Sequence, residues 1–451
     1  MKPSIPQGTR DFSAEVVVKR NYIFNIIKTQ FELFGFEPLE TPAFENVETL
    51  MGKYGDEGDK LIFKILNNGL DLDEKKAKAR EDFETVLQGK NVKGITERAL
   101  KYDLTIPFAR YVAMNHGKLT FPLKRYQIQP VWRADRPQRG RYREFYQCDV
   151  DIVGSQSLFN ELELIQIYQN VFQALNVKVS ICINNRKILA ALAELVGGAE
   201  NMMNITIAID KLDKIGIDKV NEELSNRGLN TAAIEKINQY LQIAQSNLSN
   251  DEIIEQLQNM FLHSDLGKNG IEELSYILKN IENVEIDVTL ARGLNYYTGT
   301  ILEVKPVDVK IGSIGGGGRY DDLTGLFGLK DMPGVGISFG VDRIYDVVEE
   351  LNLFPENLST SVDVILLNFG TEFDKRNREI LSFLRKHNIS CELYPDVVKT
   401  DKQFKYAEKK NIDFVIMINE HELSQELISI KNIVTGEKKL ISLEETVNLF
   451  H

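Results

Sequence analysis

A stretch of alternating polar and apolar residues, from Pro122 to Val153, constrains the fold of this chain most. A period of two residues predicts β-strands, and the segment RADRPQRGRYRE in its middle has the composition of a turn. The sequence therefore predicts a long β-hairpin, with one strand on each side of this turn.

The predicted hairpin is strongly basic although the chain as a whole is acidic. Seven lysine and arginine residues stand between Lys124 and Arg143 against a single acid, Asp135, whereas the net charge of the chain is -12. The acidic balance argues against sequence-independent nucleic-acid binding over the whole surface. The concentrated basic segment predicts a local anion site, and a solvated basic hairpin is the alternative.

Changes in periodicity along the chain predict an α+β protein of several domains. Helix-period sequence between two strand-rich regions indicates a helical insertion, and LFPENLSTSV has the composition of a linker before alternating strands and helices. Residues 67–98 are dense in charge and predict an exposed excursion with one short helix. The expected parts are a main domain of residues 1–188 and 282–352, a helical insertion of 189–281, a linker of 353–361 and a C-terminal α/β domain of 362–451.

Several classes of protein are not expected from this sequence. No window approaches the roughly 18 to 20 apolar residues of a membrane-spanning helix, and the first residues have no apolar signal core, so we expect a cytoplasmic protein without a membrane partner. Cys148, Cys182 and Cys391 are far apart and predict neither a disulfide framework nor a metal site. There is also no GxxxxGK[ST] loop, so a nucleotide would not bind in the common parallel-sheet manner.

Three segments carry residues suited to phosphate chemistry. Guanidinium groups of the hairpin, and Arg343 on a later helix, could stabilise charge on phosphate oxygens, although a surface salt bridge would also explain Arg343. ARGLNYYTGT places two adjacent tyrosines in a strand-like segment, where they would point to opposite faces unless the strand is irregular, and one of them could simply pack in the core. The run from Gly315 to Gly318 allows close backbone approach, or alternatively forms a tight turn.

The order of these segments resembles the class II aminoacyl-tRNA synthetases. The first class motif, which forms the dimer interface in the family, is matched by GFEPLETPAFE, the second by VWRADRPQRGRYREFYQCDVDIVG and the third by GVGISFGVDRIYDVV. Two segments particular to the histidyl-tRNA synthetase family resemble LARGLNYYTGTILEV and GGGGRYDDL, and KYDLTIPFARY resembles the family's amino-acid-binding segment. Two positions depart from the family pattern: Asp135 stands where the class often has Glu, and Asn295 where the family usually has Asp.

The resemblance implies a class II catalytic domain with an antiparallel sheet, a helical insertion domain and a C-terminal anticodon-binding domain. It implies ATP as substrate, with Mg²⁺ at the β- and γ-phosphates, and no protein-held metal. Arg133 would hold the α-phosphate, and Arg292 would take the place that a metal holds in related enzymes. The residues implied to contact ATP are Arg133, Asp135, Arg141 and Arg343, and those implied in the chemistry are Arg292, Arg133 and Gln147.

The resemblance also implies a binding site for L-histidine. Asp103, Thr105 and Gln147 would orient its amino and carboxylate groups, although the first two could merely cap a helix. Asp151 and Tyr297 would hydrogen-bond the two imidazole nitrogens. The whole implied set is Asp103, Leu104, Thr105, Arg133, Gln147, Asp151, Arg292, Tyr296, Tyr297 and Tyr320.

The implied reaction has two steps, formation of histidyl-adenylate and transfer of the histidyl group to the 3′ end of tRNA(His), carried out by a homodimer. Two other classes of function stay open. One is a catalytically silent synthetase-like regulatory subunit of histidine biosynthesis, a family without the anticodon domain. The other is a non-enzymatic tRNA-binding or amino-acid-sensing module, in which Arg133 or Arg292 would be expected to be lost. The presence of these residues in this chain favours the ligase.

Overall fold

The computed structural model describes residues 2–54, 58–246, 248–291, 296–356, 358, 362–425 and 427–450, and for residues 213, 214 and 423 it describes the backbone only. The chain forms two compact units, one of residues 1–11 with 20–354 and one of residues 12–19 with 355–451. None of the helices in these described ranges has the length and apolar character that crossing a membrane requires.

The first unit is built on an eight-stranded sheet whose order is β1-β5-β6-β11-β10-β9-β7-β8. Neighbours from β5 to β7 pair antiparallel, and only the two edge strands pair parallel. The strands are β1 (Glu37–Pro38), β5 (Leu123–Trp132), β6 (Glu144–Val153), β7 (Val179–Asn185), β8 (Glu285–Ile286), β9 (Thr300–Pro306), β10 (Gly315–Tyr320) and β11 (Gly334–Gly340). The predicted hairpin is therefore present as β5 and β6.

The two faces of this sheet differ because residues alternate along each strand. In β11, Val335, Ile337 and Phe339 point to the back face, where α1 (Ala14–Leu33) and α6 (Phe159–Ala174) pack. The ring of Phe339 lies 4.7 Å from that of Tyr168 on α6 and 5.8 Å from that of Phe31 on α1. The front face of the same strand carries only glycine and serine, which leaves space for a site.

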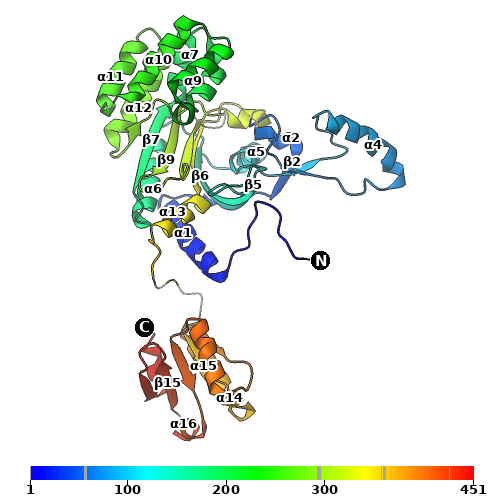
Figure 1. Ribbon diagram of the computed structural model, residues 1–451, viewed down its shortest axis with the longest axis vertical. Coiled ribbons are helices and arrows are strands. Elements are labelled where there is room, and N and C mark those ends of the chain that lie inside the picture. The colour runs from blue at the N-terminus through cyan, green and yellow to red at the C-terminus, as the bar shows by residue number, and fades with distance from the viewer. Residues whose placement is uncertain are drawn as a thin grey trace. The chain divides into compact units, whose positions relative to one another are not determined.

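Helices fill the segment between β7 and β8, as its sequence pattern predicted (Figure 1). They are α7 (Arg186–Leu195), α8 (Met202–Ile209), α9 (Leu212–Asn226), α10 (Thr231–Gln245), α11 (Asn250–Met260) and α12 (Asp265–Asn280). The helix expected after β11 is α13 (Val341–Glu350).

Residues 67–98 form an excursion from a small second sheet. This sheet has the order β2-β4-β3, with β2 at Phe44–Asn46, β3 at Lys64–Ile65 and β4 at Arg98–Leu100. Between β3 and β4 the chain extends away from the sheet and forms α4 (Asp73–Leu87), which has no buried residue (Figure 1). Two further helices lie beside this sheet, α2 (Val47–Leu50) and α5 (Thr105–Asn115).

One expectation about local structure was wrong, and one of two alternatives is excluded. The strand expected through the tyrosine segment begins only at Thr300, so Tyr296 and Tyr297 precede β9 and escape the alternation of a strand. The glycine run does not form a tight turn, because Gly315–Gly318 pairs with β9 on one side and β11 on the other.

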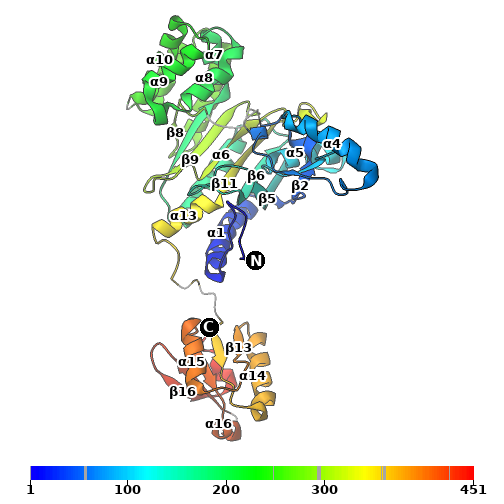
Figure 2. The ribbon, with the colours of Figure 1, turned by 45° about the vertical axis from the view of Figure 1, so that its right-hand side comes forward.

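The second unit is a small α/β domain with a five-stranded sheet of order β13-β12-β14-β15-β16. The elements are β12 (Val364–Leu366), α14 (Asp374–Lys386), β13 (Cys391–Leu393), α15 (Thr400–Lys409), β14 (Phe414–Met417), α16 (Glu420–Gln425), β15 (Ile428–Asn432), β16 (Lys438–Ile441) and α17 (Leu443–Val447). Figure 2 shows α14 and α15 beside this sheet. Alternate residues of β12 belong to two separate cores, one with α14 and α17 and the other with α15.

Candidate active site

Two adjoining cavities open on the front face of the large sheet. The larger has a volume of about 440 Å³, within the usual range for small-molecule sites, and the smaller has about 60 Å³. Their linings share Arg133, Gln147, Tyr297 and Ser338, together with two glycines of β10. Ligand groups that occupy the two cavities would therefore meet at these residues.

Glycines of β10 and β11 make the floor of the smaller cavity. A Cβ atom on Gly336 would lie 2.0 Å from Oδ1 of Asp151, and one on Gly318 would lie 2.7 Å from the carbonyl oxygen of Thr300 and 3.0 Å from the ring of Tyr297. Side chains at these positions would displace the groups that line the cavity. The glycines thus allow Asp151 and Tyr297 to lie directly against the strand backbone.

Most of the residues expected at the site come together in these cavities. Those expected at ATP line the larger cavity: Arg133, Asp135, Arg141 and Arg343. Those expected at histidine line the smaller one: Asp103, Thr105, Arg133, Gln147, Asp151, Tyr296, Tyr297 and Tyr320. Leu104 is buried at the start of α5 and lines neither cavity, and Arg292 and Asn295 lie outside the described residues.

The guanidinium groups of Arg133 and Arg343 in the larger cavity are held by backbone carbonyls, and that of Arg133 also by an aromatic ring. Arg133 donates from Nε to the carbonyl of Tyr102 at 3.1 Å, and its guanidinium lies over the Tyr102 ring at 4.3 Å. Arg343 donates to the carbonyls of Gly140 and Ser313, both at 2.7 Å. Because these contacts fix the cations before a ligand arrives, little reorganisation is needed to face an anion.

Asp103 offers a buried oxygen at the entrance to α5. Its Oδ1 accepts hydrogen bonds from the hydroxyl of Tyr54 at 2.9 Å and from the backbone N–H of Ile106 at 3.2 Å, so it does cap the helix. Its Oδ2 is buried and has no hydrogen-bond partner among the residues that the structure describes. Burial raises the pKa of this carboxyl, and a cationic group of a ligand would restore its ionised form.

Asp151 is the partner of a buried arginine that was not expected at the site. Arg125 pairs with Oδ2 of Asp151 at 2.8 Å, and the two side chains are only 1% and 3% exposed. The hydroxyl of Tyr320 donates to the other oxygen. Arg125 and Asp151 stand opposite each other in the β5–β6 register, and no pattern of neighbouring residues in the sequence signals this pairing.

The two adjacent tyrosines line the same cavity because they lie in irregular backbone. Their rings are 5.0 Å apart, and the ring of Tyr296 is 6.1 Å from that of Tyr320. Burial raises the pKa of each of these phenols, so they stay protonated hydrogen-bond donors at neutral pH.

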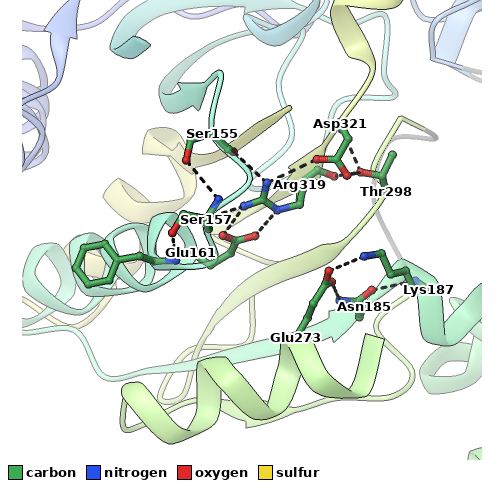
Figure 3. Close-up of polar contacts among 10 residues, drawn as sticks. Ser155, Ser157, Glu161, Asn185, Lys187, Glu273, Thr298, Arg319 and Asp321 are labelled. Carbon is green, nitrogen blue, oxygen red and sulfur yellow. Dashed lines mark hydrogen bonds and ion pairs between the residues drawn. The ribbon is translucent and has the colours of Figure 1, made fainter. Parts of the chain in front are cut away.

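A second buried ion pair supports the site from behind (Figure 3). Arg319, next to Tyr320 on β10, points to the back face and binds Glu161 of α6 through two hydrogen bonds of 2.6 and 2.7 Å. The backbone N–H of Thr298, next to Tyr297, donates to the carbonyl of Arg319 at 2.8 Å, and the hydroxyl of Thr298 donates to Asp321 at 2.6 Å. These contacts tie the tyrosine segment to β10, and sequence reasoning gave no role to Arg319 or Glu161.

We expect Arg319→Met to lower the free energy of unfolding of the first unit by about 3–5 kcal/mol, because it leaves the buried Glu161 carboxylate without its partner. Denaturant unfolding measures the change. The double variant Arg319→Met/Glu161→Met removes both charges and should recover most of the loss. Equal stability of wild type and the single variant would contradict a structural role for this pair.

Comparisons with known proteins agree over the whole chain. Residues 72–344 match the family model described as histidyl-tRNA synthetase, and residues 361–451 match that of the anticodon binding domain. The chain is 50% identical over 450 residues to the histidine–tRNA ligase of Phocaeicola vulgatus, with 98% of each chain covered, and 52% identical to that of Christiangramia forsetii, with 97% of this chain and 96% of the relative covered. The crystal structure of histidyl-tRNA synthetase from Nostoc sp. PCC 7120 superposes with a TM-score of 0.81, at 28% identity and full coverage of both chains.

Proposed function

The chain belongs to the histidyl-tRNA synthetase family, and on this basis we propose which substrate each of its two cavities binds. It is an ATP-dependent ligase that joins L-histidine to tRNA. One observation supports this assignment of substrates. An arginine-lined cavity adjoins a small cavity lined by buried carboxylates and tyrosines, and Arg133 and Gln147 line both. ATP would occupy the first cavity and histidine the second, so that the reacting groups meet at Arg133.

In the first step, a carboxylate oxygen of histidine attacks the α-phosphorus of ATP, the bond to the β-phosphate breaks, and pyrophosphate leaves. Arg133 would hold the α-phosphate at this junction, with its guanidinium held beforehand by Tyr102. Arg343, Arg141 and Asp135 would contact the rest of ATP. Arg292 is proposed as a further cation at the α-phosphate. Two reacting anions are brought together here, and fixed cations lower the cost of their approach.

Histidine would be held at both ends. Oδ2 of Asp103, which has no hydrogen-bond partner within the described part of the chain, suits the α-ammonium group, with Thr105 beside it. Asp151 and Tyr297 would contact the imidazole ring, which can donate from one nitrogen and accept at the other. Tyr296 and Tyr320 would shape the pocket around it, and the buried Leu104 would support the pocket from the start of α5.

Mg²⁺ would enter with ATP. Such an ion usually binds substrate phosphates and one or two carboxylates. Asp135 and Glu303 line the larger cavity and provide carboxylate oxygens, so the donor set fits this ion. Mg²⁺ there would neutralise charge on the leaving pyrophosphate.

In the second step, a terminal ribose hydroxyl of tRNA(His) attacks the acyl carbon, and AMP leaves. We propose that residues 1–188 and 282–352 form the catalytic domain, 189–281 an insertion that contacts the acceptor arm, 353–361 a linker, and 362–451 the anticodon-binding domain. A homodimer through the GFEPLETPAFE segment and a cytoplasmic location, where translation takes place, are also proposed.

The test of this function is histidine-dependent exchange of pyrophosphate into ATP, followed by charging of a tRNA(His) transcript. We expect exchange with histidine and none above background with glutamine, asparagine or phenylalanine. A folded protein without histidine-dependent exchange would instead favour a catalytically silent regulatory subunit.

A further inference from the structure

Asp149 on β6 is one of the residues that line the smaller cavity. It stands two residues from both Gln147 and Asp151 on β6, so the three side chains share the front face of the sheet. Across the strands its neighbours are Gln127 on β5 and Ser338 on β11. The residue is 2% exposed and lines the cavity. Sequence reasoning assigned it no role.

The charge of Asp149 is not compensated in the way that the charge of Asp151 is. Arg125 forms its ion pair with Asp151, and in the described ranges of the chain no ion pair to Asp149 is found. The hydrogen-bond partners of Asp149 are neutral, namely Nε2 of Gln147 at 3.4 Å and the hydroxyl of Ser338. The titratable groups that interact with it electrostatically are Arg125, Lys101, Asp103, Cys148, Asp151, Tyr168 and Tyr297.

Building on the function proposed above, we propose that Asp149 is a specificity-determining residue of the histidine pocket. Its carboxylate supplies the negative charge that remains after Arg125 has neutralised Asp151, and the one imidazole N–H, directed at both carboxylates, can meet that charge with a charge-assisted hydrogen bond. An aromatic side chain without a donor, such as that of phenylalanine, leaves this buried charge unpaired and is rejected.

The same carboxylate also orients Gln147. The amide nitrogen of Gln147 donates to Ser338 at 2.9 Å and to Asp149, which turns the amide oxygen toward Nη2 of Arg133 at 3.3 Å. Asp149 thus links the floor of the histidine cavity to the cation at the junction with the ATP cavity.

The charge of Asp149 is expected to depend on pH in the neutral range. Burial raises the pKa of this carboxyl to about 7, the charges of Asp151 and Asp103 act in the same direction, and Arg125 and the Ser338 hydrogen bond oppose them. Since the pKa is raised, the negative charge is present above about pH 7 and is lost as the pH falls below it. The contribution of Asp149 to histidine binding should likewise be present above about pH 7 and decrease as the pH falls below it.

The experiment measures the KM for histidine in the exchange reaction from pH 6 to 9, in wild type and in Asp149→Asn. We expect the ratio of the two KM values, variant over wild type, to be about 10- to 100-fold above pH 8, the value of one hydrogen bond to a charged group, and to fall toward one at pH 6. Ionisation of free histidine affects both proteins equally and cancels in this ratio. The KM for ATP should change little, and Asp308→Asn, which removes an exposed carboxylate, is the matched control.

A ratio near one at pH 8, or a large ratio that does not change with pH, would overturn the inference. If Asp149→Asn does not fold, the pH dependence of the KM for histidine in the wild type still tests the inference. Its KM for histidine, corrected for the ionisation of free histidine, should rise as the pH falls below about 7, and a flat corrected profile would overturn the inference. Absence of any histidine-dependent exchange in the wild type would count against the proposed function instead.

Discussion

Arg133→Ala is expected to lower the rate of histidine-dependent pyrophosphate exchange by about 10²- to 10³-fold, the usual loss for one fixed donor that faces charge developing in a transition state. Arg133 lines both cavities, and its guanidinium is held by the carbonyl of Tyr102 and by the amide oxygen of Gln147. The loss should fall mainly on kcat, because the α-phosphate gains charge only as the reaction proceeds. Steady-state exchange at saturating ATP and histidine measures it.

Arg136→Ala is the matched control for this variant. Arg136 lies three residues away on the same hairpin, carries the same charge, is exposed and lines neither cavity. Its loss should leave exchange almost unchanged. If both variants lost activity equally, the basic hairpin would act through its overall charge, and if Arg133→Ala kept a near-normal kcat, Arg133 would not contact the α-phosphate.

Asp151→Ala is expected to raise the KM for histidine steeply and to remove most of the discrimination against other amino acids. A site that buries polar groups matched to its substrate rejects analogues by roughly 10⁴-fold or more, because an analogue leaves those groups unpaired. Asp151 is held in place by Arg125 and Tyr320 against Gly336, so its position relative to a bound ring is defined. Exchange measured with histidine, glutamine and phenylalanine gives the discrimination.

The structure adds a second effect of this variant, because Asp151→Ala leaves Arg125 buried and unpaired. Removing one partner of such a pair costs about 3–5 kcal/mol of stability. The double variant Arg125→Met/Asp151→Ala separates the two effects, since it removes both charges. It should regain much of the stability and still fail to select histidine. If it kept wild-type KM and selectivity, Asp151 would be structural, and Asp149 with Tyr297 would have to recognise the imidazole.

Patterns of local sequence determined the elements of this protein. The alternation on both sides of the RADRPQRGRYRE turn predicted β5 and β6, and helical periodicity predicted the helices between β7 and β8. Such patterns depend only on residues that are close together along the chain, so they can be recognised in a single sequence. The ordered motifs likewise pointed to the family, and the matches over residues 72–344 and 361–451 confirmed it.

Only the tertiary structure decided which side chains meet. Nothing local distinguishes Arg125 from the other basic residues of the hairpin, yet the strand register places it against Asp151 in the core. Arg319 and Glu161 are 158 positions apart and form a pair because α6 packs on the back of β10. Pairing with β9 and β11 also made the glycine run a central strand, contrary to the alternative of a turn. Partners, burial and charge compensation arise from contacts between distant segments, and a local pattern carries no information about those contacts.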